Sequence, residues 1–133
     1  MDKAYEMVRQ FHRAFSVPLA QEPQMLAPER AQRRCDWMRE EIDEFLQAQD
    51  LYDQADAMID LIYFALGTLA EMGVKPGEIF EIVHRANMAK LFKDGKPHYN
   101  AQSKVIKPPE WQDPKDELIR QIDLQRAQNS KKD

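Results

Sequence analysis

Apolar residues recur at three- and four-residue steps along nearly the whole chain, and no segment alternates between apolar and polar residues with a period of two. This spacing predicts an all-α fold. Prolines, glycines and capping residues divide the pattern into five candidate helices, the first with Asp2 as its N-cap and the third with Gly73 as its stop. They run from about Asp2 to Phe15, from Pro28 through Phe45, from Leu51 to Met72, from Pro76 to Leu91 and from Asp113-Pro114 to Gln125, and residues 129–133 are expected to fray.

The length of 133 residues fits one domain, residues 1–133, with a C-terminal helix and tail from about residue 110. A helical subunit of this size often completes its core by association, so we expect a four-to-five-helix bundle completed by dimerisation. Helix 51–72 is apolar around much of its girth and is predicted to be the buried central element. On helix two, the stripe predicted to face the core consists of Ala31, Cys35, Met38, Ile42 and Phe45.

The charge balance limits the kinds of partner. The 19 basic and 23 acidic residues give a net charge of -4, so the chain lacks the basic footprint of a protein that coats a nucleic-acid polymer. The single cysteine, Cys35, cannot form an internal disulfide, which fits a reducing compartment. The N-terminal residues form no apolar leader, and the uncharged run after Asp60 is too short to span a bilayer. We therefore expect a soluble cytoplasmic protein with no membrane partner.

Acidic residues on helices two and three suggest a metal site. Asp60 lies in the most apolar stretch of the chain, residues 57–66, where an unpartnered carboxylate is costly unless it gains a proton or a cation. Asp56 shares its helix face, and Glu41 and Glu44 share a face of helix two. Oxygen-only ligands favour Mg²⁺, with Mn²⁺ as a substitute, and Mg²⁺ sites are commonly completed by substrate phosphates. The predicted substrate is therefore a polyphosphate.

Other interpretations of these residues remain open. The acids of helix two can form a solvated face, and Asp60 can be a buried acid satisfied by Arg34 or Tyr63. Glu81 and His84 form one Glu-x-x-His pair of the kind found in dinuclear iron or manganese bundles. Such bundles need two of these pairs, so this interpretation ranks below magnesium.

With these residues in view, the chain resembles the MazG-like, all-α nucleoside triphosphate pyrophosphohydrolases, in the branch with phosphoribosyl-ATP pyrophosphohydrolase-like and dUTPase-like members. The resemblance extends from the first helix to Pro108-Pro109. It rests on Glu40-Glu41-Ile42-Asp43-Glu44, on the block at residues 56–63, and on residues 83–91 followed by Asp94-Gly95-Lys96.

The resemblance implies magnesium-dependent hydrolysis of a nucleoside triphosphate to the monophosphate and pyrophosphate by a homodimer or a tetramer built from dimers. It matches Glu41, Glu44 and Asp60 to metal ligands. It matches Glu40 to an extra glutamate that holds a further metal or activates water, so that Glu40 or Glu44 is the expected general base. The family's remaining glutamate position is Ala57 here, and Asp56 is the expected substitute.

The resemblance also matches Asn87 and Lys90 to nucleotide and phosphate contacts, with Lys90 stabilising charge during catalysis. Lys104 and Lys107 on a basic loop are further phosphate candidates. Trp37 and Tyr63 are either core residues or a stacking surface for a base. The expected role is housekeeping of the nucleotide pool. Phosphoribosyl-ATP pyrophosphohydrolase-like activity, a non-catalytic nucleotide-binding protein and a purely structural helical dimerisation module are the alternatives.

Overall fold

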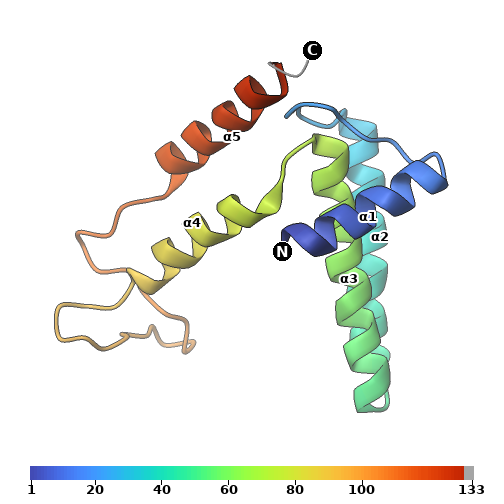
Figure 1. Ribbon diagram of the computed structural model, residues 1–133. Coiled ribbons are helices and arrows are strands. Elements are labelled where there is room, and N and C mark those ends of the chain that lie inside the picture. The colour runs from blue at the N-terminus through green and yellow to red at the C-terminus, as the bar shows by residue number, and fades with distance from the viewer. Residues whose placement is uncertain (131–133) are drawn as a thin grey trace.

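The computed structural model describes residues 1–130, which form five α-helices and no β-strand (Figure 1). The helices are α1 (Asp2–Ala14), α2 (Pro28–Gln47), α3 (Leu51–Met72), α4 (Pro76–Met88) and α5 (Lys115–Ser130). An isolated β-bridge between Tyr99 and Val105 closes a bend in the long connection from α4 to α5. The predicted all-α fold is confirmed.

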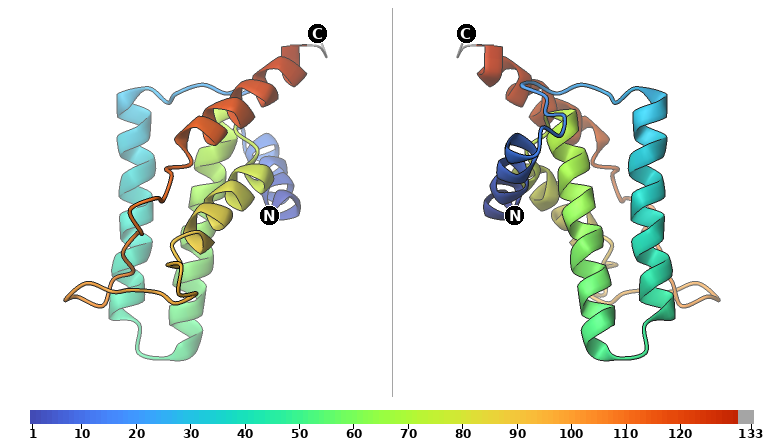
Figure 2. Two further views of the ribbon diagram at one scale, coloured as in Figure 1. Left: turned by 90° about the vertical axis from the view of Figure 1, so that its left-hand side faces the viewer. Right: turned by 90° about the vertical axis from the view of Figure 1, so that its right-hand side faces the viewer.

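The longest two helices, α2 and α3, form an antiparallel hairpin (Figures 1 and 2). The turn between them is short because Asp50 caps α3, its side chain accepting a hydrogen bond from the backbone N–H of Asp53 at 2.8 Å. At the other end, Gly73 terminates α3 in the left-handed conformation with φ of 70°, as predicted. The hairpin therefore holds the acidic segments of α2 and α3 side by side.

Helix α1 packs across the C-terminal half of α3. Tyr5 and Val8 of α1 meet Leu66 and Ala70 of α3, and these four buried residues form a hydrophobic core cluster. Asp2 does not act as the predicted N-cap of α1, because it is already helical and its carboxylate accepts a hydrogen bond from the backbone N–H of Gly77 at 2.8 Å. It caps α4 instead.

Helices α4 and α5 form an arm that bends away from the hairpin (Figure 1). The carboxamide of Gln125 joins α5 to the start of α4, donating to the Lys75 carbonyl and accepting from its N–H, both at 2.9 Å. Asn129 donates to the Gln21 carbonyl at 2.7 Å. The prediction of fraying from residue 129 is thus wrong for Asn129, which is helical and anchored, while residues 131–133 lie outside the described part of the chain.

The predicted orientation of α2 is wrong within a single chain. Ala31 and Ile42 are exposed, and Cys35, Met38 and Phe45 are only partly buried. The strip facing α3 carries Arg34, which is 3% exposed, and Trp37, whose ring contacts that of Phe64 with centroids 5.8 Å apart. A buried ion pair described below holds α2 in this rotation and leaves the apolar stripe outward.

Helix α3 is buried over only part of its length. Ala57, Leu66 and Ala70 are buried, but Ile59 and Ile62 are 61% and 48% exposed. The prediction that this helix is the buried central element is therefore confirmed for Ala57, Leu66 and Ala70 and wrong for Ile59 and Ile62 in the single chain. Within residues 1–130 no single helix is long and apolar enough to span a membrane. Helices α3 and α4 reach that length and apolar content only when they are taken together, and they are bent by 115° relative to each other.

Candidate active site

The hairpin brings the four predicted metal ligands into one neighbourhood, with Glu41 and Glu44 on α2 and Asp56 and Asp60 on α3. We call these four residues the acidic site. These acids act on one another: burial raises the pKa of Glu41 most, followed by a side-chain hydrogen bond with Glu44 and then by the negative charges of Glu44, Asp60 and Asp56. Burial also raises the pKa of Asp60, followed by the charges of Asp56 and Glu44. Acids from two helices therefore face the same space.

Glu41 carries the clearest sign that the acidic site lacks a partner. Its Oε2 atom is buried and has no hydrogen-bond partner within the described residues. Asp60 is partly buried, whereas Glu44 and Asp56 are exposed at the rim. A buried carboxylate oxygen without a donor is unfavourable, so a cation bound here would stabilise the arrangement.

Next to the rim, at the turn of the hairpin, is a hollow of about 260 Å³. It is lined by Glu44, Gln47, Ala48, Asp53 and Asp56. Asp53 was missed in the sequence analysis because an acid in the first turn of a helix is usually explained by the helix dipole. Its place beside Glu44 and Asp56 adds a fifth carboxylate to this end of the hairpin.

The donor chemistry fits magnesium, since all the candidate ligands are carboxylates and one oxygen is buried without a partner. Across residues 1–130, however, no group of three or more His, Cys, Asp or Glu side chains is already arranged to hold a metal ion. The four residues therefore stay predicted ligands.

A second feature, the aromatic cavity, lies between α1, α2 and α3 and measures about 630 Å³. Its aromatic lining is Phe11, Trp37, Tyr63 and Phe64, and exposed Glu40 of the acidic segment also lines it. The rings of Phe11 and Tyr63 meet edge to face with centroids 5.7 Å apart. The cavity therefore places flat apolar surfaces next to the glutamate that precedes Glu41.

The cavity is backed by an ion cluster that the sequence analysis missed. Glu71 accepts hydrogen bonds from Arg30 Nε at 2.7 Å and Arg30 Nη2 at 3.0 Å, and also pairs with buried Arg34. Burial raises the pKa of Glu71, but the two guanidinium groups outweigh it and lower the pKa overall. Arg30 and Arg34 also lie over the Trp37 ring, 5.2 and 5.1 Å from its centroid. The cluster therefore fixes one wall of the aromatic cavity.

His12 extends this cluster to α1. Its Nδ1–H donates to the Pro18 carbonyl at 2.9 Å, so Nε2 is left to accept from Arg34 Nη2 at 3.4 Å. The helices approach this closely because Gly67 lacks a side chain: a Cβ there would lie 2.9 Å from His12 Nε2. Since Arg34 is committed to Glu71, the alternative in which Arg34 satisfies Asp60 is wrong.

The predicted phosphate contacts gather elsewhere, around Trp111. Lys90 Nζ donates to Asn87 Oδ1 at 2.8 Å, and Lys90 and Lys107 lie 5.7 and 4.6 Å from the Trp111 ring centroid. Trp111 Nε1 donates to the Ala86 carbonyl at 2.7 Å, which anchors the loop to α4.

This group sits on the α4 arm and its loop, which Figure 1 shows apart from the acidic end of the hairpin. Lys104 lies on the same loop and is exposed, as are Glu81 and His84 on α4. A single chain does not bring Asn87, Lys90, Lys104 or Lys107 to the acidic site.

Comparison with known proteins identifies the family. The model of the phosphoribosyl-ATP pyrophosphohydrolase family matches residues 8–87, which is more than half of the chain. The chain belongs to this family. The matched range contains the whole acidic site, so the predicted resemblance to the MazG-like all-α pyrophosphohydrolases is confirmed.

A solved structure gives a second comparison within the same class of enzyme. The chain is similar to the crystal structure of a candidate NTP pyrophosphohydrolase from Exiguobacterium sp. 255-15, and the two sequences are 29% identical. The match covers 94% of this chain and 96% of the other, with a TM-score of 0.54. No functionally curated protein matches the chain. The family and the solved structure together support pyrophosphohydrolase activity.

Proposed function

We propose that the chain is a magnesium-dependent nucleoside triphosphate pyrophosphohydrolase that converts a nucleoside triphosphate and water into the monophosphate and pyrophosphate. The observation that carries this proposal is the acidic site, where carboxylates of α2 and α3 share one space and Glu41 Oε2 is buried without a partner. The family match and the similar solved structure support the class of reaction.

In this proposal Glu41, Glu44, Asp56 and Asp60 hold the metal between the two helices. When bound, magnesium neutralises phosphate charge and lowers the pKa of a coordinated water. Glu40 or Glu44 accepts a proton from the water as it attacks the α-phosphorus. The bond from the α-phosphorus to the bridging oxygen breaks, and pyrophosphate leaves with that oxygen.

The aromatic cavity is the proposed place of the nucleoside. Trp37 and Tyr63 offer flat surfaces for a base, and Trp37 is held rigid by the guanidinium groups of Arg30 and Arg34. Trp37 and Tyr63 of this cavity lie one helical turn from Glu41 and Asp60, so a base in the cavity directs its phosphates toward the acidic site.

A second copy of the chain completes the proposed enzyme. Large apolar side chains on α2 and α3 are exposed in the single chain, among them Ile42, Leu46, Ile59 and Ile62. Exposed apolar surface of this kind is typical of subunit interfaces. In a homodimer, or a tetramer built from dimers, the arm of the partner copy would supply the phosphate contacts that the single chain keeps apart: Asn87, Lys90, Lys104 and Lys107.

A nucleotide panel tests the function. The purified chain is incubated with Mg²⁺ and each ribo- and deoxyribonucleoside triphosphate, and pyrophosphate and single phosphate are measured separately. Phosphoribosyl-ATP is included because the family match favours it as the second candidate substrate. We expect pyrophosphate to be released only with metal present.

Two variants locate the activity. Asp60→Asn keeps the size of the side chain but removes its charge, so it should abolish turnover in a folded protein. Asp36→Asn, an exposed acid on the same hairpin that pairs with Arg39, is the matched control and should keep wild-type activity. Release of single phosphate, or full activity of Asp60→Asn, would contradict the proposal.

A further inference from the structure

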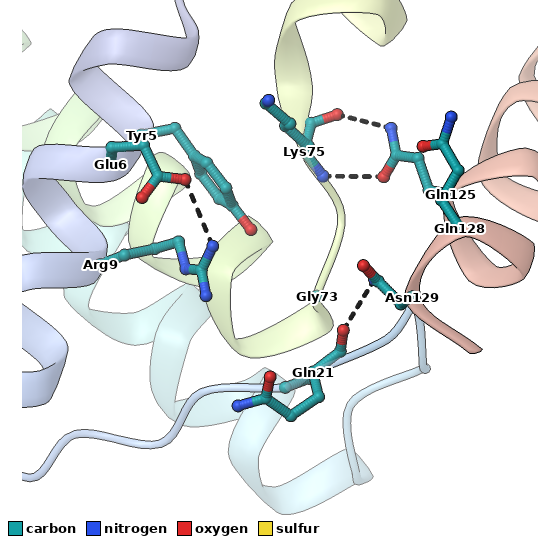
Figure 3. A pocket seen from close by; sticks show the side chains of 10 residues that line it. Tyr5, Glu6, Arg9, Gln21, Gly73, Lys75, Gln125, Gln128 and Asn129 are labelled. Carbon is teal, nitrogen blue, oxygen red and sulfur yellow. Dashed lines mark hydrogen bonds and ion pairs between the residues drawn. The ribbon is translucent and has the colours of Figure 1, made fainter. Parts of the chain in front are cut away.

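The described chain contains a second polar cavity at the opposite end of α3 from the acidic site. It measures about 320 Å³ and lies where α1, the end of α3 and α5 meet (Figure 3). Its lining comprises Tyr5, Glu6, Arg9, Ala20, Gln21, Gly73, Lys75, Gln125, Gln128 and Asn129. We call it the junction cavity. The segments around it are far apart in the sequence, so only the folded chain assembles it.

Hydrogen-bond donors surround the junction cavity. Arg9 contributes a guanidinium group whose Nε is buried and has no hydrogen-bond partner within residues 1–130. Tyr5 is 3% exposed, and Figure 3 shows its hydroxyl pointing into the cavity. Lys75 adds a second cation, with its Nζ 4.0 Å from Asp2. A buried donor without an acceptor is unfavourable, so an acceptor in the cavity would be stabilised.

The donors in the junction cavity suit an anion. Arg9 and Lys75 carry two positive charges, and each has an exposed carboxylate beside it. Glu6 is 51% exposed and pairs with Arg9 at 3.2 Å, and Asp2, outside the lining, is 46% exposed and lies 4.0 Å from Lys75 Nζ. The amides of Gln125 and Asn129 are already hydrogen-bonded to Lys75 and Gln21, so they fix the walls, and Arg9 Nε, which has no partner within residues 1–130, is the donor left for a ligand. Donors from different sides suit a compact oxyanion.

We propose that the junction cavity is a binding site for a small oxyanion of the phosphate class, separate from the acidic site. Arg9 and Tyr5 of α1 would donate to the bound anion, as would Lys75 between α3 and α4. The anion would thereby join α1 to the start of the α4–α5 arm. This site does not depend on the proposed catalytic function.

The test is calorimetric titration of the metal-free full chain, in chelator, with inorganic phosphate, pyrophosphate and acetate at matched ionic strength. Without metal the acidic site repels anions, so binding there does not contribute. We expect saturable binding of phosphate or pyrophosphate and none of acetate. Asp60→Asn should bind as the wild type does, even where it has lost all turnover, which separates this proposal from the proposed function.

Variants of the lining decide whether the anion occupies the junction cavity. Arg9→Gln and Lys75→Gln should each weaken phosphate affinity by about tenfold or more, since hydrogen bonds to a charged partner are strong. Arg13→Gln, also on α1 but outside the cavity, should bind as the wild type does. Circular dichroism confirms folding, and if one variant fails to fold, the other carries the test. The proposal would be overturned if neither phosphate nor pyrophosphate bound, or if only acetate did. It would also be overturned if folded Arg9→Gln and Lys75→Gln bound phosphate with wild-type affinity.

Discussion

Replacement of Glu71 by alanine should be among the most damaging single changes in the chain. Glu71 is buried at the C-terminal end of α3 and is the acid that neutralises Arg34, which is 3% exposed. Without Glu71, the guanidinium of Arg34 would stay buried with no counter-charge. Arg30 would lose two hydrogen bonds but could turn toward water, because its side chain is 25% exposed.

The magnitude follows from burial. Breaking a buried ion pair by removing one partner destabilises by about 3–5 kcal/mol. Breaking an exposed pair costs about 0–1 kcal/mol, and Glu6→Ala, which removes the pair with Arg9, is the matched control. At a slope of about 2 kcal/mol per molar urea, Glu71→Ala should lower the unfolding midpoint by about 2 M, against at most about 0.5 M for the control.

Urea unfolding followed by far-UV circular dichroism measures this difference, with every variant at the same protein concentration because association affects the midpoint. A double variant, Arg34→Met with Glu71→Met, replaces the pair by apolar side chains and should be more stable than Glu71→Ala. If Glu71→Ala shifts the midpoint no more than Glu6→Ala does, the ion cluster does not hold α2 against α3 and the reasoning fails.

Two further predictions concern the same packing, and a third concerns the loop between α4 and α5. Burial lowers the pKa of His12 below its ordinary 6.5. As the pH drops, His12 therefore takes up a proton in the unfolded chain at a higher pH than in the folded chain, and the free energy of unfolding should fall below about pH 6.5. Unfolding of His12→Asn, measured over the same pH range, should lack this decrease. Gly67→Ala places a Cβ 3.0 Å from Arg34 Nη1, and overpacking of about 1–3 kcal/mol should exceed the helix-propensity gain of about 1 kcal/mol, giving a lower melting temperature rather than a higher one. Trp111→Phe removes the hydrogen bond to the Ala86 carbonyl, so limited proteolysis should cut the loop between α4 and α5 faster than in wild type, and equal rates would contradict the anchoring role.

The helices could be predicted from the sequence because their ends are set by local chemistry. Pro28 and Pro76 begin α2 and α4, and Gly73 ends α3 in the conformation that glycine favours. The direction in which each helix packs is not local. The α2 stripe with Ile42 is apolar, but in the single chain it lies outward because Arg34 on the neighbouring strip pairs with Glu71.

The acidic site was predictable because an acid within an apolar helix, such as Asp60, stands out in the sequence. The same signal was present at Glu71, which lies between Ala70 and Met72. Its partners are 37 and 41 residues away on α2, and no spacing rule identifies contacts at that separation. The direction of α4 could not be predicted from the sequence either. The axes of α3 and α4 differ by 115°, and this angle is held by hydrogen bonds from Gly77 to Asp2 of α1 and from Lys75 to Gln125 of α5.

We propose that Glu41, Glu44 and Asp60 lie together because a divalent cation binds between them. Crystals grown with manganese, measured by anomalous scattering, test it most directly. We expect an anomalous peak coordinated by carboxylate oxygens from both α2 and α3, with Glu41 Oε2 among the ligands. A peak only at other positions, or none at saturating manganese, would contradict it.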